Sequence, residues 1–267
     1  QPNAMGGREV GGLANTLAAH MEIENESHRR AVQEFWQAPH ICKNPGFKAV
    51  DMFKQVAEGK IKAIWIMATN PVVSLPEREK IEAALAHCEL VIVSDVSTQS
   101  DTLKYADVIF PATTWSEKQG TVTNSERRIS LQRSASIAPG EAKHDWQILC
   151  EVATHMGFGE AFNYSSVADI FREHARLSGL NNEGTRDFDI SALAEIDDDA
   201  YRQLRPIQWP VTINHPDGTK RLFSNGRFFH EDKRARFIPV SHAVHAAVEA
   251  DNTYALNSGR LRDQWHT

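Results

Sequence analysis

The sequence predicts an α/β fold: a parallel, doubly wound, Rossmann-like nucleotide-binding domain followed by the start of a β-barrel domain. Between residues 61 and 110, short apolar strands alternate with helical segments, which is the pattern of half a doubly wound sheet. Crossovers of this kind are right-handed almost without exception, so these strands are predicted to be parallel. After Pro210, short strand-like segments separated by turn residues replace the helical pattern.

The first segments are predicted to be a connection and two helices. Residues 6–12 are glycine-rich, but no strand precedes them as a dinucleotide fingerprint requires, so we interpret them as a flexible connection. Residues 27–36 and 47–57 are predicted to be helical. The apolar face of the second helix consists of Phe47, Val50, Phe53 and Ala57.

The parallel sheet is predicted from three apolar runs, at residues 61–68, 90–93 and 108–110. A helix opens at Pro76-Glu77 between the first two strands, and residues 101–106 form a helical turn between the second and the third. The buried side of the first of these helices carries Ile81, Leu85 and Cys88.

Turn and capping residues define the later elements. Residues 120–133 are predicted to be a loop that returns as a strand. Asp145 is predicted to cap a helix that stops at Gly157, and Ser166 with Asp169 forms a capping box for a helix over 167–177. The acidic run 197–199 marks the start of a short helix. Short strands are predicted at 211–213, 221–223, 236–240 and from 254.

Composition narrows the class of protein. The 267 residues carry a formal charge of −6 and are 41% apolar, which supports a packed core and argues against nucleic acid or an acidic membrane as partner. The longest apolar run, 63–68, is far too short to span a membrane. Cys42, Cys88 and Cys150 lie too far apart for a local zinc or iron–sulfur site. The short apolar runs predict a soluble protein, and the small, odd number of cysteines predicts a location in the cytoplasm.

Small and polar residues follow each predicted parallel strand, where ligands bind in an open sheet. They occupy residues 69–74, Ser94-Asp95 and residues 111–114. An aspartate at the end of the second strand suits ribose hydroxyls or the donor edge of guanine. The alternatives are that Asn70-Pro71 is only a turn and Ser94-Asp95 only a helix cap. The absence of a GxGxxG loop argues against a plain NAD site.

Other groupings give no self-contained catalytic set. The sequence has no GxSxG elbow and no P-loop. His242 and His245 form an HxxH pair without an evident third ligand, so they are interpreted as surface histidines and no metal ligands are assigned. Arg127-Arg128 is either a solvated charge cluster or, in a cleft, a phosphate contact.

Five stretches resemble a known family. They are residues 3–13 (NAMGGREVGGL), 65–74 (WIMATNPVVS), 93–112 with VSD, YADV and PA, 115–128 (WSEKQGTVTNSERR), and 258–267 (SGRLRDQWHT). The chain resembles a segment of the large subunit of prokaryotic molybdenum oxidoreductases that carry two molybdopterin guanine dinucleotides, and among these most resembles the assimilatory nitrate reductases. Because it begins at Gln1 and ends directly after a strand-like segment, we expect it to be an internal or C-terminal-side piece of such a subunit.

The resemblance implies a division into four parts. Residues 1–39 are the tail of a preceding domain and a linker, 40–160 the α/β domain that binds a molybdopterin guanine dinucleotide, 161–209 a connection, and 210–267 the truncated start of a C-terminal β-barrel domain. By motif position the cofactor-binding residues are Asn70, Ser94, Asp95, Lys118, Asp145, Ser258, Gly259, Arg260, Leu261, Arg262, Asp263, Gln264, Trp265, His266 and Thr267. The last ten of these are expected beside the pterin end.

The resemblance also implies a function for the parent enzyme. That enzyme would reduce nitrate to nitrite by oxygen-atom transfer at molybdenum, with electrons from a donor protein or domain arriving through a [4Fe-4S] cluster. The cysteine ligands of the cluster and of molybdenum have no counterpart here, so this chain alone is predicted to be inactive. A formate dehydrogenase of the same superfamily is the nearest alternative, and a non-catalytic electron-transfer scaffold is the second.

Overall fold

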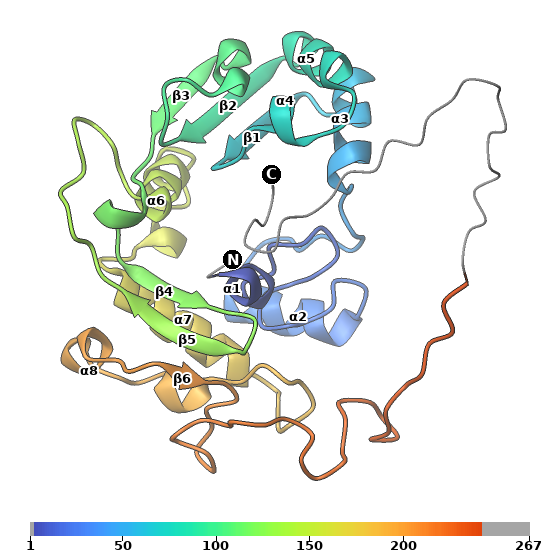
Figure 1. Ribbon diagram of the computed structural model, residues 1–267, viewed down its shortest axis with the longest axis vertical. Helices are drawn as coiled ribbons and strands as arrows, with labels where there is room; N and C mark the ends of the chain where they lie inside the picture. The colour runs from blue at the N-terminus through green and yellow to red at the C-terminus, as the bar shows by residue number, and fades with distance from the viewer. Residues whose placement is uncertain (1–2, 242–267) are drawn as a thin grey trace, which may run out of the picture. The chain divides into compact units, whose positions relative to one another are not determined.

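The computed structural model describes residues 3–241. It divides into two compact units, Pro2–Lys220 and a second that includes residues 221–241. All helices and strands of the described residues lie in the first unit (Figure 1). Among these residues, no helix combines the length and the apolar character that crossing a membrane requires.

A three-stranded parallel sheet forms the first half of this unit, as predicted. Its strands are β1 (Ala63–Met67), β2 (Leu90–Asp95) and β3 (Val108–Pro111), in that spatial order. The helices α3 (Ala49–Ala57) and α5 (Arg78–His87) pack on it. The resulting core contains Phe53, Val56, Ile64, Ile66, Val72, Ile81, Ala84, Leu85, Val91 and Val93. Apolar burial on this scale stabilises the sheet and fixes the edge where its strands end.

The buried face of α3 differs from the predicted one. Phe53 is buried as expected, but Phe47 and Val50 are 56% and 42% exposed and Val56 takes the second core position. Phe47 lies outside because the helix begins at Ala49, so this residue does not share its periodicity. Within the helix the core-facing stripe passes through Phe53 and Val56, which leaves Val50 and Ala57 exposed.

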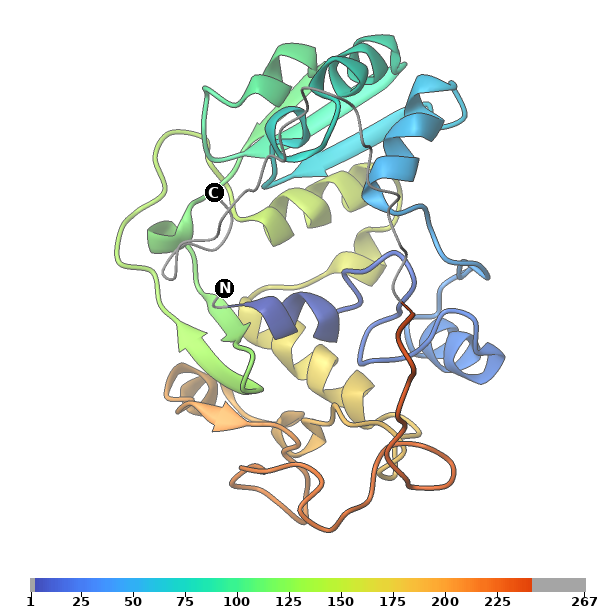
Figure 2. The same cartoon turned by 45° about the vertical axis from the view of Figure 1, so that its right-hand side comes forward.

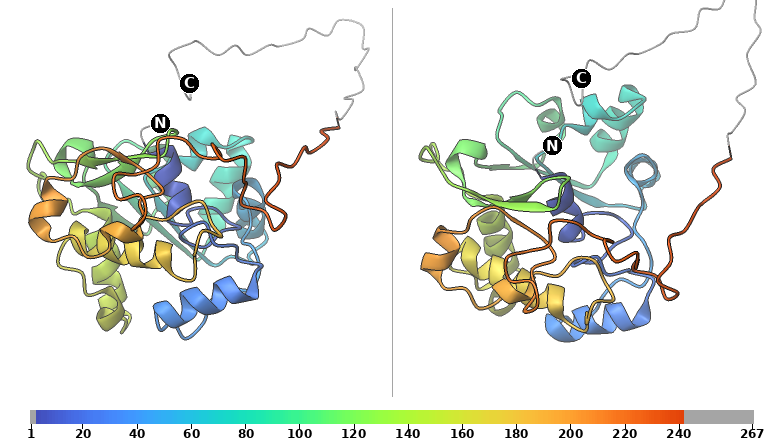
Figure 3. Two further views of the ribbon diagram at one scale, coloured as in Figure 1. Left: turned by 90° about the horizontal axis from the view of Figure 1, so that it is seen from below. Right: turned by 60° about the horizontal axis from the view of Figure 1, so that its bottom comes forward.

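A second sheet is antiparallel and joins distant parts of the chain. The strands β4 (Gly120–Thr123) and β5 (Arg128–Gln132) form a hairpin where a loop and one strand were expected. Asn124 Oδ1 organises its turn by accepting the backbone N–H groups of Glu126 and Arg128. The short strand β6 (Ile207–Gln208) pairs with β5, and α7 packs against β4 (Figure 3).

Five further helices belong to the first unit. They are α2 (Glu26–Phe35), α4 (Pro71–Ser74), α6 (Asp145–His155), α7 (Val167–Gly179) and α8 (Asp198–Arg202), with 3-10 turns at Asp101–Tyr105, Trp115–Glu117, Gly159–Phe162 and Ser191–Leu193. Ser166 caps α7, as predicted, and the acidic run 197–199 begins α8 as expected, with Asp197 as the N-cap. The cap of α6 was misassigned: His144 is the N-cap and Asp145 is the first helical residue.

Two further predictions are corrected by the structure. The glycine-rich start is not a flexible connection, because Ala4–Glu9 forms the helix α1. Residues 211–213, 221–223 and 236–240 are not strands, and the described residues contain no closed barrel. The turns predicted between these segments are present, but within the described residues the segments have no partner strand with which to pair. The strand predicted from residue 254 lies outside the described residues.

Candidate functional site

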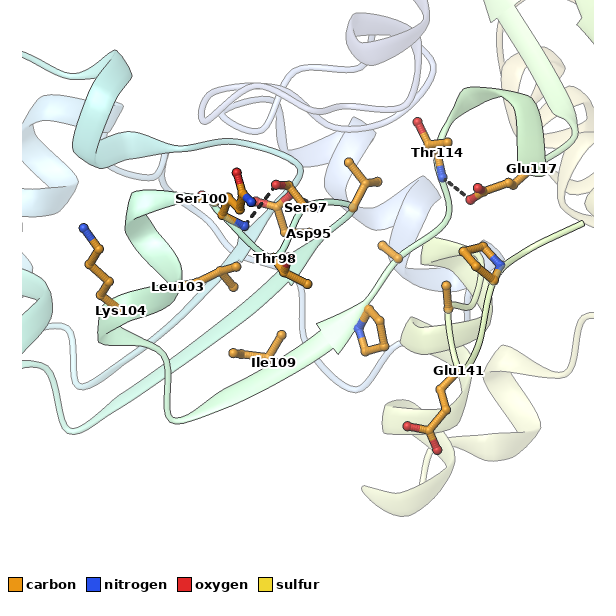
Figure 4. Close-up of a pocket in the computed structure, with 16 residues that line it drawn as sticks. Asp95, Ser97, Thr98, Ser100, Leu103, Lys104, Ile109, Thr114, Glu117 and Glu141 are labelled. Carbon is orange, nitrogen blue, oxygen red and sulfur yellow. Dashed lines mark hydrogen bonds between the residues drawn. The ribbon is translucent and has the colours of Figure 1, made fainter. Parts of the chain in front are cut away.

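A cavity of about 760 Å³ opens at the carboxyl edge of the parallel sheet. It is bounded by the loops after β1, β2 and β3 and by the start of β4. The topology of the parallel sheet brings the first three of these together, and β4 belongs to the second sheet. A second hollow of about 600 Å³ shares Asp95, Ser97, Ser100 and Thr114 with it (Figure 4). The predicted residues Asn70, Asp95 and Lys118 all line the larger cavity.

Asp95 is the last residue of β2 and is partly exposed to the cavity. Its Oδ1 accepts the backbone N–H of Ser97 at 3.0 Å, which closes the turn that follows the strand. Among the described residues, no donor is bonded to its second oxygen. A carboxylate with a free oxygen at this position is an acceptor for a donor-rich ligand edge.

Ser94, one residue earlier, has its side chain in the protein interior. It is fully buried, and its hydroxyl accepts the indole N–H of Trp65 at 2.8 Å. Its side chain lines neither hollow. The structure therefore brings Asp95 to the cavity and leaves the Ser94 hydroxyl behind it.

Asn70 follows β1 and stands directly before α4. Its Oδ1 accepts the hydroxyl of Thr102 at 2.7 Å, and Thr102 is fully buried. A hydrogen bond from Lys104 lowers the pKa of Asp101, and the Asn70 side chain adds to this lowering. Asn70 thus joins the loops after β1 and β2 and fixes one wall of the cavity.

Lys118 and Asp145 form an ion pair beside the cavity. Lys118 Nζ donates to Asp145 Oδ2 at 2.7 Å, and each side chain is about 30% exposed. The residues come from different elements: Lys118 precedes β4, and Asp145 begins α6. Lys118 lines the cavity whereas Asp145 does not, so Asp145 fixes the ammonium group at the edge of the cavity.

The sequence reasoning missed Asn3, Gln99 and Ser100, which also line the larger cavity. Asn3 belongs to the resembling stretch 3–13, which was the available signal. Among the described residues, the buried Ser100 Oγ has no hydrogen-bond partner. A hydroxyl left unpartnered beside a cavity is expected where a ligand completes its hydrogen bonds.

Arg127 and Arg128 do not line either hollow. The Arg127 guanidinium lies 5.3 Å from the centre of the Trp209 ring and donates to the Trp209 carbonyl. Arg128 donates to the Gln208 side chain at 3.2 Å. Both arginines therefore bind β6 and its continuation, an arrangement that is neither the solvated charge cluster nor the phosphate contact considered from the sequence.

The chemistry of the site is that of binding. It combines a carboxylate acceptor, a primary ammonium group, small hydroxyls and an open glycine, since a Cβ added at Gly120 would meet no atom within 4 Å. These groups fit a nucleotide with a pyrophosphate. Within residues 3–241, no three His, Cys, Asp or Glu side chains are placed to hold a metal ion. Residues Ser258 to Thr267 lie outside the described residues.

Comparison with known proteins agrees with this chemistry. Residues 3–155 match the molybdopterin oxidoreductase family. Nitrate reductases of Klebsiella oxytoca and Shewanella frigidimarina are each 48% identical over the whole chain, which spans 30% and 29% of their lengths. An F420-dependent formate dehydrogenase subunit alpha of Methanocaldococcus jannaschii is 32% identical over the whole chain and 37% of its own length.

The family match covers more than half of the chain and includes the parallel sheet, the larger cavity and Lys118 with Asp145. The sequence identity to these relatives extends over the remaining residues as well. On these grounds the chain belongs to the molybdopterin oxidoreductase family.

Proposed function

We propose that the cavity at the carboxyl edge of the parallel sheet holds one guanine dinucleotide arm of a molybdopterin cofactor that carries two such arms. The observation that carries this proposal is the presence of the Asp95 carboxylate and the Lys118 ammonium group in one cavity. Asp95 would accept the N–H groups of guanine, and Lys118 would face the pyrophosphate. Asp145 would keep the Lys118 ammonium group in place, and Asn70 would fix the wall that the loops after β1 and β2 form. Residues 258–267 would contact the pterin end.

The parent enzyme we infer is a nitrate reductase of the cytoplasm. When bound, the cofactor supplies the molybdenum centre at which oxygen-atom transfer takes place. This chain would bind and orient it, while a [4Fe-4S] cluster held elsewhere in the polypeptide would receive electrons from a donor protein or domain. Support comes from the two nitrate reductases, which are more similar to this chain than the formate dehydrogenase is.

A formate dehydrogenase is the second candidate function. The observation that favours it is the identity of 32% to the formate dehydrogenase subunit, which extends over the whole chain. The same cavity would serve either enzyme, because the nucleotide arm does not react. The third candidate, a scaffold subunit without metal, would share the fold but carry no metal ligand upstream.

The test compares two lysine variants of the full-length polypeptide. Lys118→Gln removes the cation from the cavity, whereas Lys143→Gln removes a cation that pairs with Glu151 at 2.6 Å outside it. Guanine nucleotide released on denaturation and molybdenum are measured per chain. Lys118→Gln should retain about tenfold less cofactor, the effect of one charge-assisted contact, and Lys143→Gln the wild-type amount.

Activity assays then separate the candidates. Nitrate reduction and formate oxidation, measured with a viologen dye, distinguish the two enzymes. A protein that lacks both activities and contains no molybdenum would support the scaffold. Wild-type protein without guanine nucleotide would contradict the proposal. Equal cofactor content in the two lysine variants would contradict the role of Lys118.

A further inference from the structure

One threonine of β4 holds both ends of α1. Asn3, just before α1, accepts the backbone N–H of Thr123 at 2.9 Å through its Oδ1. Glu9, the last residue of α1, accepts the hydroxyl of the same threonine at 2.9 Å through its Oε2. Figure 2 shows α1 beside the hairpin that contains β4. Because Asn3 and Gly120, Thr121 and Val122 of β4 line the larger cavity, α1 and β4 together form one of its walls.

Glu9 also binds a third segment of the chain. Its Oε1 accepts the indole N–H of Trp209 at 2.5 Å, and Trp209 follows directly after β6. The backbone N–H of Trp209 in turn donates to the Arg127 carbonyl at 3.1 Å, in the turn of the hairpin. A single side chain therefore fixes α1 against both β4 and the continuation of β6.

The side chain of Glu9 is buried, which is unusual for a residue that can carry a charge. Glu9 is 4% exposed, and its two donors, Thr123 and Trp209, are 3% and 1% exposed. Burial raises the pKa of Glu9, and the hydrogen bonds from Thr123 and Trp209 oppose that rise. Core packing alone would favour an apolar residue here, whereas a fully bonded polar group selects one arrangement of its neighbours.

We propose that Glu9 is a positioning residue for the nucleotide cavity. It keeps α1 at one distance and angle from β4, so that Asn3 and the first three residues of β4 hold the shape of the wall that the cofactor contacts. Glu9 lines neither hollow itself, so it acts only through α1 and β4. This inference rests on the proposed function of the cavity.

The test uses variants that differ in hydrogen bonding but little in size. Glu9→Leu removes both acceptors, and Thr123→Val removes only the hydroxyl and is the milder change. Glu9→Gln keeps both bonds, because its carbonyl accepts from Trp209 and its amide donates to the Thr123 oxygen. Ser178→Ala is the control: Ser178 is fully buried and bonded to Ala175 and Ile190, and it lines neither hollow.

The readouts are guanine nucleotide per chain, its rate of loss on dilution, and the melting temperature, all on the full-length protein. Glu9→Leu should lose the nucleotide about tenfold faster than wild type, and Thr123→Val several-fold faster, since each leaves buried donors or acceptors unpaired. Glu9→Gln should restore the wild-type rate. Ser178→Ala should lower the melting temperature without changing the rate of loss.

Two results would overturn the inference in different ways. If Glu9→Leu and Thr123→Val melt earlier but lose nucleotide at the wild-type rate, as expected of Ser178→Ala, then Glu9 only stabilises the fold. If wild-type protein carries no guanine nucleotide, the proposed function of the cavity is wrong, and the positioning role is wrong with it.

Discussion

One carboxylate oxygen of Asp95 accepts a hydrogen bond from the backbone N–H of Ser97. The other oxygen accepts no hydrogen bond from any described residue. In Asp95→Asn the side-chain carbonyl still accepts the Ser97 N–H, so the turn is kept, but an amide donor then faces the donors of guanine. Loss of a charged hydrogen bond costs about 1.5–3 kcal/mol, or roughly one to two decades in affinity. We expect the full-length Asp95→Asn variant to contain less molybdenum and an unchanged iron–sulfur spectrum.

Asp107→Asn is the matched control for this prediction. Asp107 also accepts a backbone N–H, from Val91 at 2.7 Å, but it precedes β3 and lines neither hollow. Its replacement should leave the molybdenum content at the wild-type value. If Asp95→Asn also kept that value, Asp95 would have only its turn-closing role.

The positions of site residues are predictable from the sequence where the topology decides them. Asn70 and Asp95 follow parallel strands, and the carboxyl ends of such strands meet at one edge. Ser94 and Asp95 were both expected at the ligand, but successive side chains of a strand point to opposite faces, so the alternation in β2 separates them. Asn3 was missed because its place at the cavity depends on contacts with β4, 120 residues away.

At the scale of the element, the two adjacent glycines of α1 allow a paired test. A Cβ added at Gly6 would lie 1.9 Å from Asn3 Oδ1, whereas one added at Gly7 would meet no atom within 4 Å. Gly6→Ala should therefore push the Asn3 side chain off the Thr123 N–H and weaken cofactor retention. Gly7→Ala should keep retention and stabilise the helix by about 0.5–1 kcal/mol. Nucleotide content and thermal melting measure both effects, and equal retention in the two variants would contradict a role of Asn3 at the cavity.

The α7 helix carries a half-buried histidine, His174, that links stability to pH. Burial lowers the pKa of His174 to about 4, and the neighbouring His20 adds to the lowering. The unfolded chain binds this proton near pH 6.5 and the folded chain does not, so the histidine's contribution is complete above about pH 6.5 and is lost as pH falls toward 4. The loss amounts to about 3 kcal/mol.

Urea unfolding at a series of pH values tests this dependence. His174→Gln removes the titrating group and should flatten the curve between about pH 6.5 and 4, while the slope from acidic residues remains. An unchanged pH dependence in His174→Gln would assign the acid sensitivity to other groups.

Elements were predictable where local sequence and packing agree. The strands β1 and β2 are apolar runs that supply core residues, and α7 begins at its capping serine. The strand β3 forms as predicted, but Val108 and Ile109 are 37% and 52% exposed. The helix α1 was missed because glycine disfavours helix locally, while the buried bonds of Glu9 to Thr123 and Trp209 stabilise it from outside. The opposite error occurred after Pro210, where strands were predicted but do not form. The residue pattern there suggests strands, but a strand needs a partner strand to form a sheet.

At the scale of the whole molecule, the first unit joins two sheets around one proposed binding function. The parallel sheet contributes Asn70 and Asp95, and the antiparallel part contributes Gly120 and the preceding Lys118. The helix α1 comes from the start of the chain and closes the wall between them. A site assembled from segments this far apart needs the unit Pro2–Lys220 intact, so truncation within it should abolish nucleotide binding.

The last prediction is that the isolated 267-residue chain reduces no nitrate. Nitrate chemistry in the proposed enzyme belongs to the metal centre, and the protein contributes binding and orientation. The chain has only three cysteines, which are widely spaced, and residues 3–241 contain no group of side chains placed to hold a metal. It spans about 30% of the length of the nitrate reductases it matches. Nitrite is measured with reduced viologen as donor, for the purified chain and for the full-length polypeptide at equal concentration. Only the full-length polypeptide should form nitrite, and nitrite formation by the isolated chain in proportion to its concentration would show that it contains a complete catalytic site.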